Sequence, residues 1–188
     1  FAQTPSLSFR SNTVAIFMET KDSFNIFAKV LFVFAGLIFG FILIRLFFIP
    51  VKINNVIMEP ALHNKDYAWF YKTRKVDSGS IVLYKSPLSG KQVGRVIAKS
   101  GDTIEIINKR IYVNGIPLHI NWKIVQKDTR TFPSRFTARD NLAAITVPNG
   151  HIFVMCDNWD IPTDSRLFGT IPLNAIVGKY IWKLSPKL

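Results

Sequence analysis

One segment near the start of the chain limits what it can form more than any other: an apolar run rich in phenylalanine. The stretch 24–48 holds eight of the sixteen phenylalanines, and no charged residue occurs from Val30 to Ile44. At about 1.5 Å per helical residue the uncharged part is roughly 22 Å long, and extension to Ile49 gives about 30 Å, the thickness of the hydrocarbon layer. A domain this small cannot cover a helix that is apolar on every face. The run therefore predicts a transmembrane anchor over residues 26–49.

The flanks of this segment fit an uncleaved anchor. Lys29 and Arg45 stand where basic side chains can reach the two headgroup layers, and Pro50 is expected to end the helix. A cleaved secretory signal is the main alternative, but its apolar part is shorter and a small-residue cleavage site follows it. The charge bias nominally favours an inside body, yet long domains cross membranes largely regardless of charge. We expect residues 1–25 to be a short N-terminal segment, disordered or an extension, and the body to be extracytoplasmic.

Composition excludes several other classes of protein. The 48% of apolar residues is too high for a disordered chain, and the single cysteine, Cys156, excludes an internal disulfide and a cysteine-built zinc site. The three histidines are scattered, so we expect neither a metal nor a cofactor. A net charge of +12 suits nucleic acid or anionic lipid. Because there is a membrane segment and no helix-turn-helix pattern, we expect the lipid bilayer and not nucleic acid as the partner.

Residues 50–188 change to short runs rich in β-branched and aromatic residues, separated by turn residues. Asn114-Gly115 predicts a two-residue hairpin turn. Residues 123–140 are charged and contain proline, which predicts a solvated insertion loop. The predicted strands are 80–84, 95–98, 103–107, 110–113, 151–155 and 175–182. The expected fold is mainly β: one N-terminal transmembrane helix followed by an all-β, barrel-like domain.

Three groups of motifs in the β region together resemble signal peptidase I, the membrane-anchored Ser/Lys endopeptidase that removes signal peptides. Residues 58–62, Met-Glu-Pro-Ala-Leu, are similar to the family's Ser-Met-x-Pro-Thr-Leu after its serine. Residues 78–102 contain close versions of Gly-Asp-Ile-Val, Lys-Arg-Val-Ile-Gly and Pro-Gly-Asp. Residues 148–179 contain versions of Val-Pro-x-Gly, Phe-x-x-Gly-Asp-Asn, Ser-x-Asp-Ser-Arg-x-Phe-Gly and Ile-x-Gly-Lys. The order and spacing of the whole set, and its place after the anchor, carry the resemblance.

Three positions to which the resemblance assigns chemistry hold unsuitable residues. The nucleophile position is Ile57, the general-base position is Gly94, and the position of the serine that orients the lysine is Pro162. Isoleucine has no lone pair, glycine has no side chain, and proline has neither a hydroxyl nor a backbone donor. Lys91 and Lys99 lie at odd offsets from Gly94, so they should point to the opposite face of the strand. No competent catalytic group is therefore expected.

Other positions keep the residue types of the family. Asn55 is a candidate oxyanion-type donor, although polar turn chemistry is the simpler interpretation. By resemblance, Met58 and Pro60 belong to the peptide cleft, and Trp69, Phe70 and Tyr71 belong to an apolar face toward lipid or cleft, ordinary core being the alternative. The resemblance also implies a structural cluster around the site: Arg95, Asp157, Asp164, Ser165 and Arg166.

These observations predict a membrane-anchored, signal peptidase I-like pseudoenzyme of the S26 type. Its expected partners are exported preproteins or surface-assembly subunits, such as those of pili, because inactive relatives of this kind occur in Gram-positive bacteria. It is expected in the cell membrane with a single pass. The alternative is a functional signal peptidase I that cleaves secreted preproteins with a different nucleophile or base.

Overall fold

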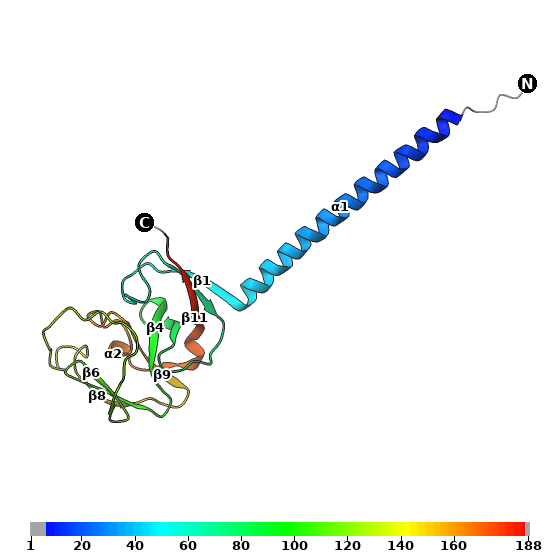
Figure 1. Cartoon of the computed structure of the whole chain (residues 1–188). Coiled ribbons are helices and arrows are strands. Elements are labelled where there is room, and N and C mark those ends of the chain that lie inside the picture. Colours follow the sequence, from blue (N-terminus) through cyan, green and yellow to red (C-terminus); the bar gives the residue numbers. More distant parts are fainter. Residues whose placement is uncertain (1–6, 187–188) are drawn as a thin grey trace, which may run out of the picture. The chain divides into compact units, whose positions relative to one another are not determined.

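The structure, a computed structural model, describes the backbone of residues 7–186 and the side chains of residues 27–186. Its contacts divide the chain into two units, with the boundary between Leu46 and Phe47. The described part of the first unit is α1 (Leu7–Phe47), one continuous helix in Figure 1, whose last residue belongs to the second unit. Its part Phe27–Phe47, with a mean hydropathy of 2.6, is long and apolar enough to cross a membrane. The helix also includes residues 7–25, which we expected outside the anchor, and residues 1–6 lie outside the described residues.

The end of α1 differs from the expected one. The helix ends at Phe47, and β1 (Phe48–Lys52) begins at the next residue, so Pro50 lies inside a strand. Pro50 is paired with Trp69 in β2 (Tyr67–Tyr71), and β1 is an edge strand with β2 on one side only. Proline has no N–H for a second neighbour, and an edge strand does not need one. Pro50 therefore belongs to a sheet edge and does not itself terminate the helix.

The larger sheet of the body has seven strands. In spatial order they are β1, β2, β11 (Ile176–Leu184), β3 (Ile81–Ser86), β4 (Gly90–Lys99), β9 (His151–Met155) and β10 (Ile171–Pro172). All neighbours are antiparallel. The short helix α2 (Ser165–Phe168) and the 3₁₀ turn η1 (Leu173–Ala175) flank β10 in the chain.

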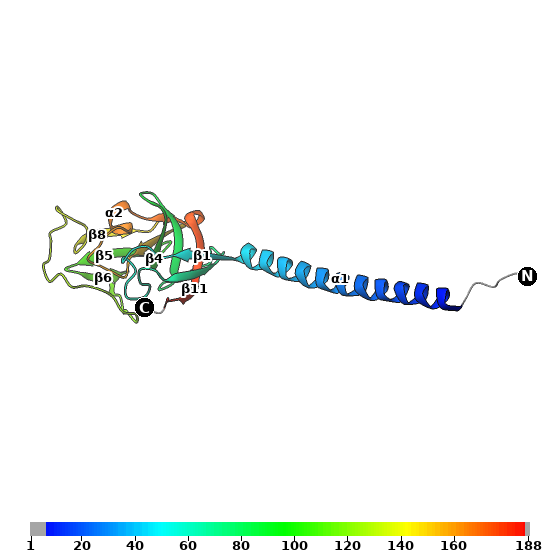
Figure 2. The same ribbon diagram turned by 90° about the horizontal axis from the view of Figure 1, so that it is seen from above.

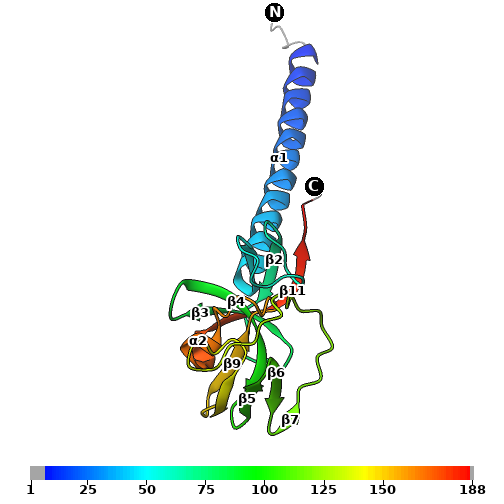
Figure 3. The same cartoon turned by 90° about the vertical axis from the view of Figure 1, so that its left-hand side faces the viewer.

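The smaller sheet has four strands, in the order β7 (Ile116–Pro117), β6 (Arg110–Val113), β5 (Thr103–Ile107) and β8 (Leu142–Thr146). Figures 1 and 2 show β5, β6 and β8 at the end of the body opposite β1 and β11, and Figure 3 shows β7 beside β6. Asn114 and Gly115 join β6 to β7 with φ values of 54° and 77°, which confirms the hairpin. The mainly β fold is confirmed. Its sheets are two open rows of strands, so the expected barrel is not closed.

The buried apolar residues form three clusters. The Ile57 cluster packs the turn after β1 against β2, β3 and β4. The Tyr84 cluster covers the other face of β3, β4 and β9, and the Phe153 cluster fills the space next to the smaller sheet. The Ile57 cluster contains Ile53, Ile57, Met58, Leu62, Ala68, Phe70, Ile81, Leu83, Val93 and Cys156; the Tyr84 cluster contains Val82, Tyr84, Val96, Ile152, Val154, Ile171 and Ile176.

Residues 123–140 have little regular structure, but an ionic network within the segment orders part of them. Arg139 donates to Asp128 Oδ2 at 2.8 Å and to Asp140 Oδ2 at 2.7 Å, and its guanidinium lies 4.8 Å from the centre of the Phe132 ring. Asp140 is buried and also accepts from the Phe132 N–H at 2.8 Å. A loop that is solvated along its whole length would leave these charges exposed, so only part of the segment fits the expectation.

The pH dependence of this network gives a first prediction. Burial raises the pKa of the Asp140 carboxyl, but hydrogen bonds from Arg139 and from the Phe132 N–H outweigh it and hold the pKa below its ordinary value. A lowered folded pKa stabilises the fold above the unfolded pKa of about 3.9, and this contribution is lost as pH falls through the folded pKa. We expect Asp140→Asn to destabilise the full chain by about 1–3 kcal/mol at pH 7 and by much less near pH 2. Thermal unfolding in detergent, followed by tryptophan fluorescence, measures both values.

The matched control is Asp77→Asn. The Asp77 side chain is 78% exposed and meets Lys179 at 3.4 Å, so its loss should change the melting temperature little at either pH. A deficit of Asp140→Asn that is equal at pH 7 and pH 2 contradicts the assignment of the stabilisation to the ionised carboxylate.

Candidate active site

The position expected for the nucleophile holds a core residue. Ile57 lies in the turn that follows β1 and is 9% exposed, within the same cluster as Met58, Val93 and Cys156. Its carbonyl accepts from the Asn158 N–H at 2.9 Å, and the Asn158 side-chain amide donates to the Val56 carbonyl at 3.3 Å. The backbone of this turn is therefore fixed to the segment after β9. The side chain that it presents is aliphatic and has no group able to attack a carbonyl.

The position expected for the general base has little room for a side chain. Gly94 lies in β4 opposite Val82 of β3. A Cβ atom at position 94 would lie 3.1 Å from Cε1 of Tyr84 and 3.5 Å from Cβ of Val154. A lysine there would need the tyrosine ring to move already at its first side-chain carbon. Glycine inside a strand commonly marks such a close approach.

Tyr84 fills the space beside Gly94. Its side chain is fully buried in the Tyr84 cluster, with its ring centre 6.4 Å from that of Phe168. Burial raises the pKa of the Tyr84 phenol, and the nearby Cys156 and Asp164 act in the same direction. Among the described residues the phenol oxygen has no hydrogen-bond partner. The space next to the base position thus holds a neutral, apolar-packed ring.

Two buried arginine–aspartate pairs surround these positions. Arg95 donates to both oxygens of Asp157, at 2.7 and 2.5 Å, and to the Gly79 carbonyl at 2.7 Å. The Trp122 ring lies 4.7 Å from its guanidinium. Burial raises the pKa of the Asp157 carboxyl, and the hydrogen bonds from Arg95 oppose this rise. This pair joins β4 to the turn after β9.

The second pair orders the segment around α2. Arg166 donates to both oxygens of Asp164, at 2.9 and 2.7 Å, and to the Trp159 carbonyl at 3.0 Å. Asp164 also accepts the N–H groups of Arg166 and Cys156, so it caps α2 and ties it to the end of β9. Ser165 Oγ accepts the Val154 N–H at 3.0 Å. The five residues of the expected structural cluster thus form two pairs and one serine contact, and all are buried.

The third expected position, Pro162, is followed by a hydroxyl residue that lies near a buried thiol. Pro162 is half-buried, and the next residue, Thr163, uses its carbonyl to accept from Gln92 at 2.6 Å. Thr163 Oγ1 lies 3.9 Å from the sulfur of Cys156. Burial raises the pKa of the Cys156 thiol, and Asp164 raises it further, so the reactive thiolate is disfavoured.

A pocket of about 180 Å³ lies next to the Ile57 turn. Asn55 and Met58 contribute to it, and Lys91 lies there too, on the β4 face that carries Val93. Lys91 therefore faces away from Gly94, as expected from its odd offset, but it still reaches the pocket. Among the described residues, the wall has no serine, threonine or cysteine: it consists of Val51, Lys52, Ile53, Asn54, Asn55, Met58, Leu83, Lys91, Gln92 and Val93.

The other predicted residues are spread over several surfaces. Pro60 is half-buried in the turn after Ile57, outside the pocket wall, and Lys99 lines a separate hollow with Ser100 and His151. Phe70 is a core residue, whereas Tyr71 is exposed. In the part of the chain that is described, no group of three or more His, Cys, Asp or Glu side chains could hold a metal ion.

Comparison with known proteins identifies the family. The family model described as "Signal peptidase, peptidase S26" matches residues 26–184. The chain belongs to this signal peptidase family. Signal peptidase IB of Staphylococcus aureus is 32% identical over 148 residues, which cover 73% of this chain and 78% of that protein. A probable signal peptidase I-1 of Synechocystis is 32% identical over 117 residues, covering 57% of this chain and 54% of the relative. The crystal structure of a signal peptidase I from Enterococcus faecalis V583 aligns with 56% of this chain and 96% of that one, at 26% identity and a TM-score of 0.44.

The unpaired phenol of Tyr84 gives a second prediction. A buried hydroxyl without a partner costs about 1–3 kcal/mol of desolvation. We therefore expect Tyr84→Phe to leave the free energy of unfolding unchanged or to raise it, whereas Tyr84→Ala should lower it by about 3–5 kcal/mol through the cavity that it creates. Denaturant unfolding of the full chain in detergent measures both.

Tyr112→Phe on the half-exposed β6 is the control for the loss of a hydroxyl, and it should change stability by less than about 0.5 kcal/mol. A loss of more than about 1 kcal/mol in Tyr84→Phe would show that the phenol has a partner, such as a buried water.

Proposed function

We propose that this protein is a membrane-anchored, non-catalytic member of the signal peptidase family that binds extended segments of exported preproteins or surface-assembly subunits. The main support is the pair of positions 57 and 94: a buried isoleucine stands at the first, and the Tyr84 ring lies against the second. Serine–lysine chemistry needs a hydroxyl and an uncharged amine within hydrogen-bond reach of each other. Neither position carries such a group.

Membrane anchoring by α1 is the second part of the proposal. Signal peptidase I proteins are membrane-anchored, and Phe27–Phe47 is the one described helix that is long and apolar enough to span a bilayer. We place the β body on the extracytoplasmic side, where the precursors processed by signal peptidases emerge. This gives a single-pass protein whose pocket beside Asn55 faces exported chains.

Peptide binding remains feasible without catalysis because the sheet edge and the pocket that it needs are separate from the expected positions of the catalytic serine and lysine. β1 is an edge strand with its outer backbone groups unpaired by the sheet, and Ile53 to Asn55, which follow it, line the pocket. An extended peptide can add to such an edge through main-chain hydrogen bonds and place alternate side chains in a neighbouring pocket. Asn55 is exposed and stands at this pocket as a candidate amide donor for a bound carbonyl. From the resemblance we expected an oxyanion-type donor at this position. In this proposal the same amide binds a peptide carbonyl without catalysis.

The absence of cleavage can be tested together with its cause. In lipid vesicles, an exported precursor should be cleaved no faster by this protein than in the blank, while an active signal peptidase in the same vesicles processes it. The triple variant Ile57→Ser, Gly94→Lys and Pro162→Ser should also stay inactive, because the Tyr84 ring obstructs a side chain at position 94. Addition of Tyr84→Val should allow measurable cleavage by creating room for the lysine stem.

Two results would contradict this account. Cleavage by the wild type that disappears in Ser80→Ala would identify a working peptidase with a different nucleophile. Measurable cleavage by the triple variant, at the same rate as by the quadruple variant, would show that Tyr84 does not obstruct position 94.

Peptide binding has its own test. A photoreactive phenylalanine analogue at position 55 should crosslink a synthetic precursor peptide that carries a signal sequence, because Asn55 lines the pocket. The same analogue at position 116, on the exposed Ile116 of β7, should not. An excess of unlabelled precursor should remove the adduct at position 55. Equal yields at the two positions, or no adduct at position 55, would count against a peptide site here.

A further inference from the structure

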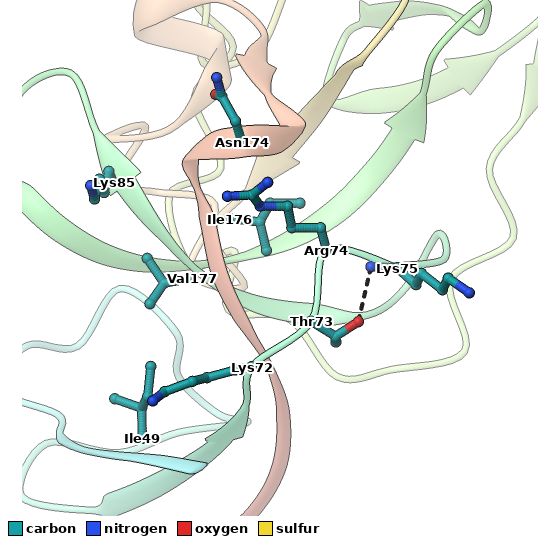
Figure 4. A pocket seen from close by; sticks show the side chains of 9 residues that line it. All are labelled: Ile49, Lys72, Thr73, Arg74, Lys75, Lys85, Asn174, Ile176 and Val177. Carbon is teal, nitrogen blue, oxygen red and sulfur yellow. Dashed lines mark hydrogen bonds between the residues drawn. The ribbon is translucent and has the colours of Figure 1, made fainter. Parts of the chain in front are cut away.

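A second, larger pocket, lined in part by the start of β11, is strongly basic. It has a volume of about 630 Å³, and its charged lining residues are Lys72, Arg74, Lys75 and Lys85. No carboxylate contributes to its wall among the described residues. Figure 4 shows the Arg74 guanidinium turned toward Ile176, Lys85 on the far side of Ile176 and Val177, and Lys75 turned away from them. The arrangement concentrates positive charge around an apolar floor.

Most of this charge is not neutralised by the protein. Arg74, Lys75 and Lys85 are exposed and form no ion pair within the described part of the chain. An adjacent hollow shares Arg74 and Lys75 and adds Lys99, and its one carboxylate, Asp77, already meets Lys179 at 3.4 Å. Several like charges held on one wall without counter-charges favour an anionic ligand.

The pocket lies close along the chain to the point where α1 ends. The N–H of Lys72 donates to the carbonyl of Phe47, the last residue of α1, at 2.9 Å. Ile49, which forms part of the wall, is only two residues beyond Phe47. With α1 in a bilayer, the turn that carries Lys72, Arg74 and Lys75 must therefore lie near the level of the lipid headgroups.

The apolar floor distinguishes a lipid from a free anion. Ile176 is buried, and Ile49 and Val177 are half-buried against the Ile57 cluster. Inorganic phosphate would use the cations and leave this floor in water. A glycerophospholipid offers both parts: a phosphodiester for the cations, and a glycerol ester region for the isoleucine and valine side chains.

We propose that this pocket binds the phosphate-bearing headgroup of an anionic phospholipid. Arg74 and Lys85 hold the phosphodiester from two sides, Lys75 adds longer-range attraction, and Ile49, Ile176 and Val177 contact the start of the acyl region. The proposal rests on membrane anchoring by α1 and does not depend on whether the protein cleaves or binds peptides.

The test compares lipid adducts of the full-length protein in detergent by native mass spectrometry. Phosphatidylglycerol should be retained at least about tenfold more tightly than phosphatidylcholine. The triple variant Arg74→Gln, Lys75→Gln and Lys85→Gln should lower the affinity for phosphatidylglycerol by about tenfold or more. The control triple Lys123→Gln, Lys127→Gln and Arg135→Gln removes the same charge from exposed side chains elsewhere and should change the affinity less than twofold.

Three outcomes would overturn the proposal. Equal retention of the two lipids by the wild type would exclude recognition of the anionic headgroup. An equal loss in the two triple variants would show an effect of net charge and no pocket. Inorganic phosphate that displaces phosphatidylglycerol at equal concentration would identify a free-anion site. None of these results affects the cleavage or crosslinking experiments, so the two proposals can fail separately.

Discussion

The buried pairs Arg95–Asp157 and Arg166–Asp164 are the interactions on which the rest of this site depends. Each arginine meets both oxygens of its carboxylate and a backbone carbonyl, so that several of the donors of a charged group are satisfied away from water. Loss of one member would leave the other charge buried and unpaired, at a cost of about 3–5 kcal/mol. The pairs join β4, the turn after β9 and α2, and this frame is independent of the residues at positions 57 and 94.

Because this frame does not depend on positions 57 and 94, these positions can hold an isoleucine and a glycine in a site that is still well packed. Ile57 adds an apolar side chain to a cluster that a serine would leave more polar, and Gly94 lets the Tyr84 ring lie against β4. The two changes have different consequences. The first adds buried apolar surface, whereas the second makes room for a ring whose phenol oxygen has no hydrogen-bond partner among the described residues. Restoring a lysine therefore involves a third residue, and only the fold reveals which one.

Much of the fold could be predicted because its strands have clear local patterns. The strands over 103–107, 110–113 and 151–155 coincide with β5, β6 and β9, where β-branched residues lie between turn signals. The strands β1, β2, β8 and the two-residue β10 were not predicted. β1 contains Pro50 and follows an apolar helix without a break, and β8 has two consecutive alanines with little burial, so local preference identifies neither. Their pairing partners, β2 and β5, decide their structure.

The candidate site was predictable only where a motif named its residues. The motif positions 57, 94 and 162 and the Arg/Asp residues could be assigned by resemblance, and their packing could not. Tyr84 and the presence of Lys91 in the pocket wall depend on strand register and on contacts between distant segments. Gly94 stands directly before the predicted strand 95–98 and was the one local signal for the close approach of Tyr84. The pairing of β3 with β4 in the structure identifies Tyr84 as the residue that approaches this glycine.

The junction at Phe47 affects how the protein meets its ligands. β1 starts at the residue after α1, and the carbonyl of Phe47 accepts a hydrogen bond from the N–H of Lys72. No spacer therefore separates the helix from the first strand of the body. With the helix embedded in lipid, the start of the body is held by the chain at the lipid surface. It samples a thin layer next to the bilayer and moves by lateral diffusion. Ligands that share that layer meet it at a high effective concentration, so even weak affinities can give substantial occupancy.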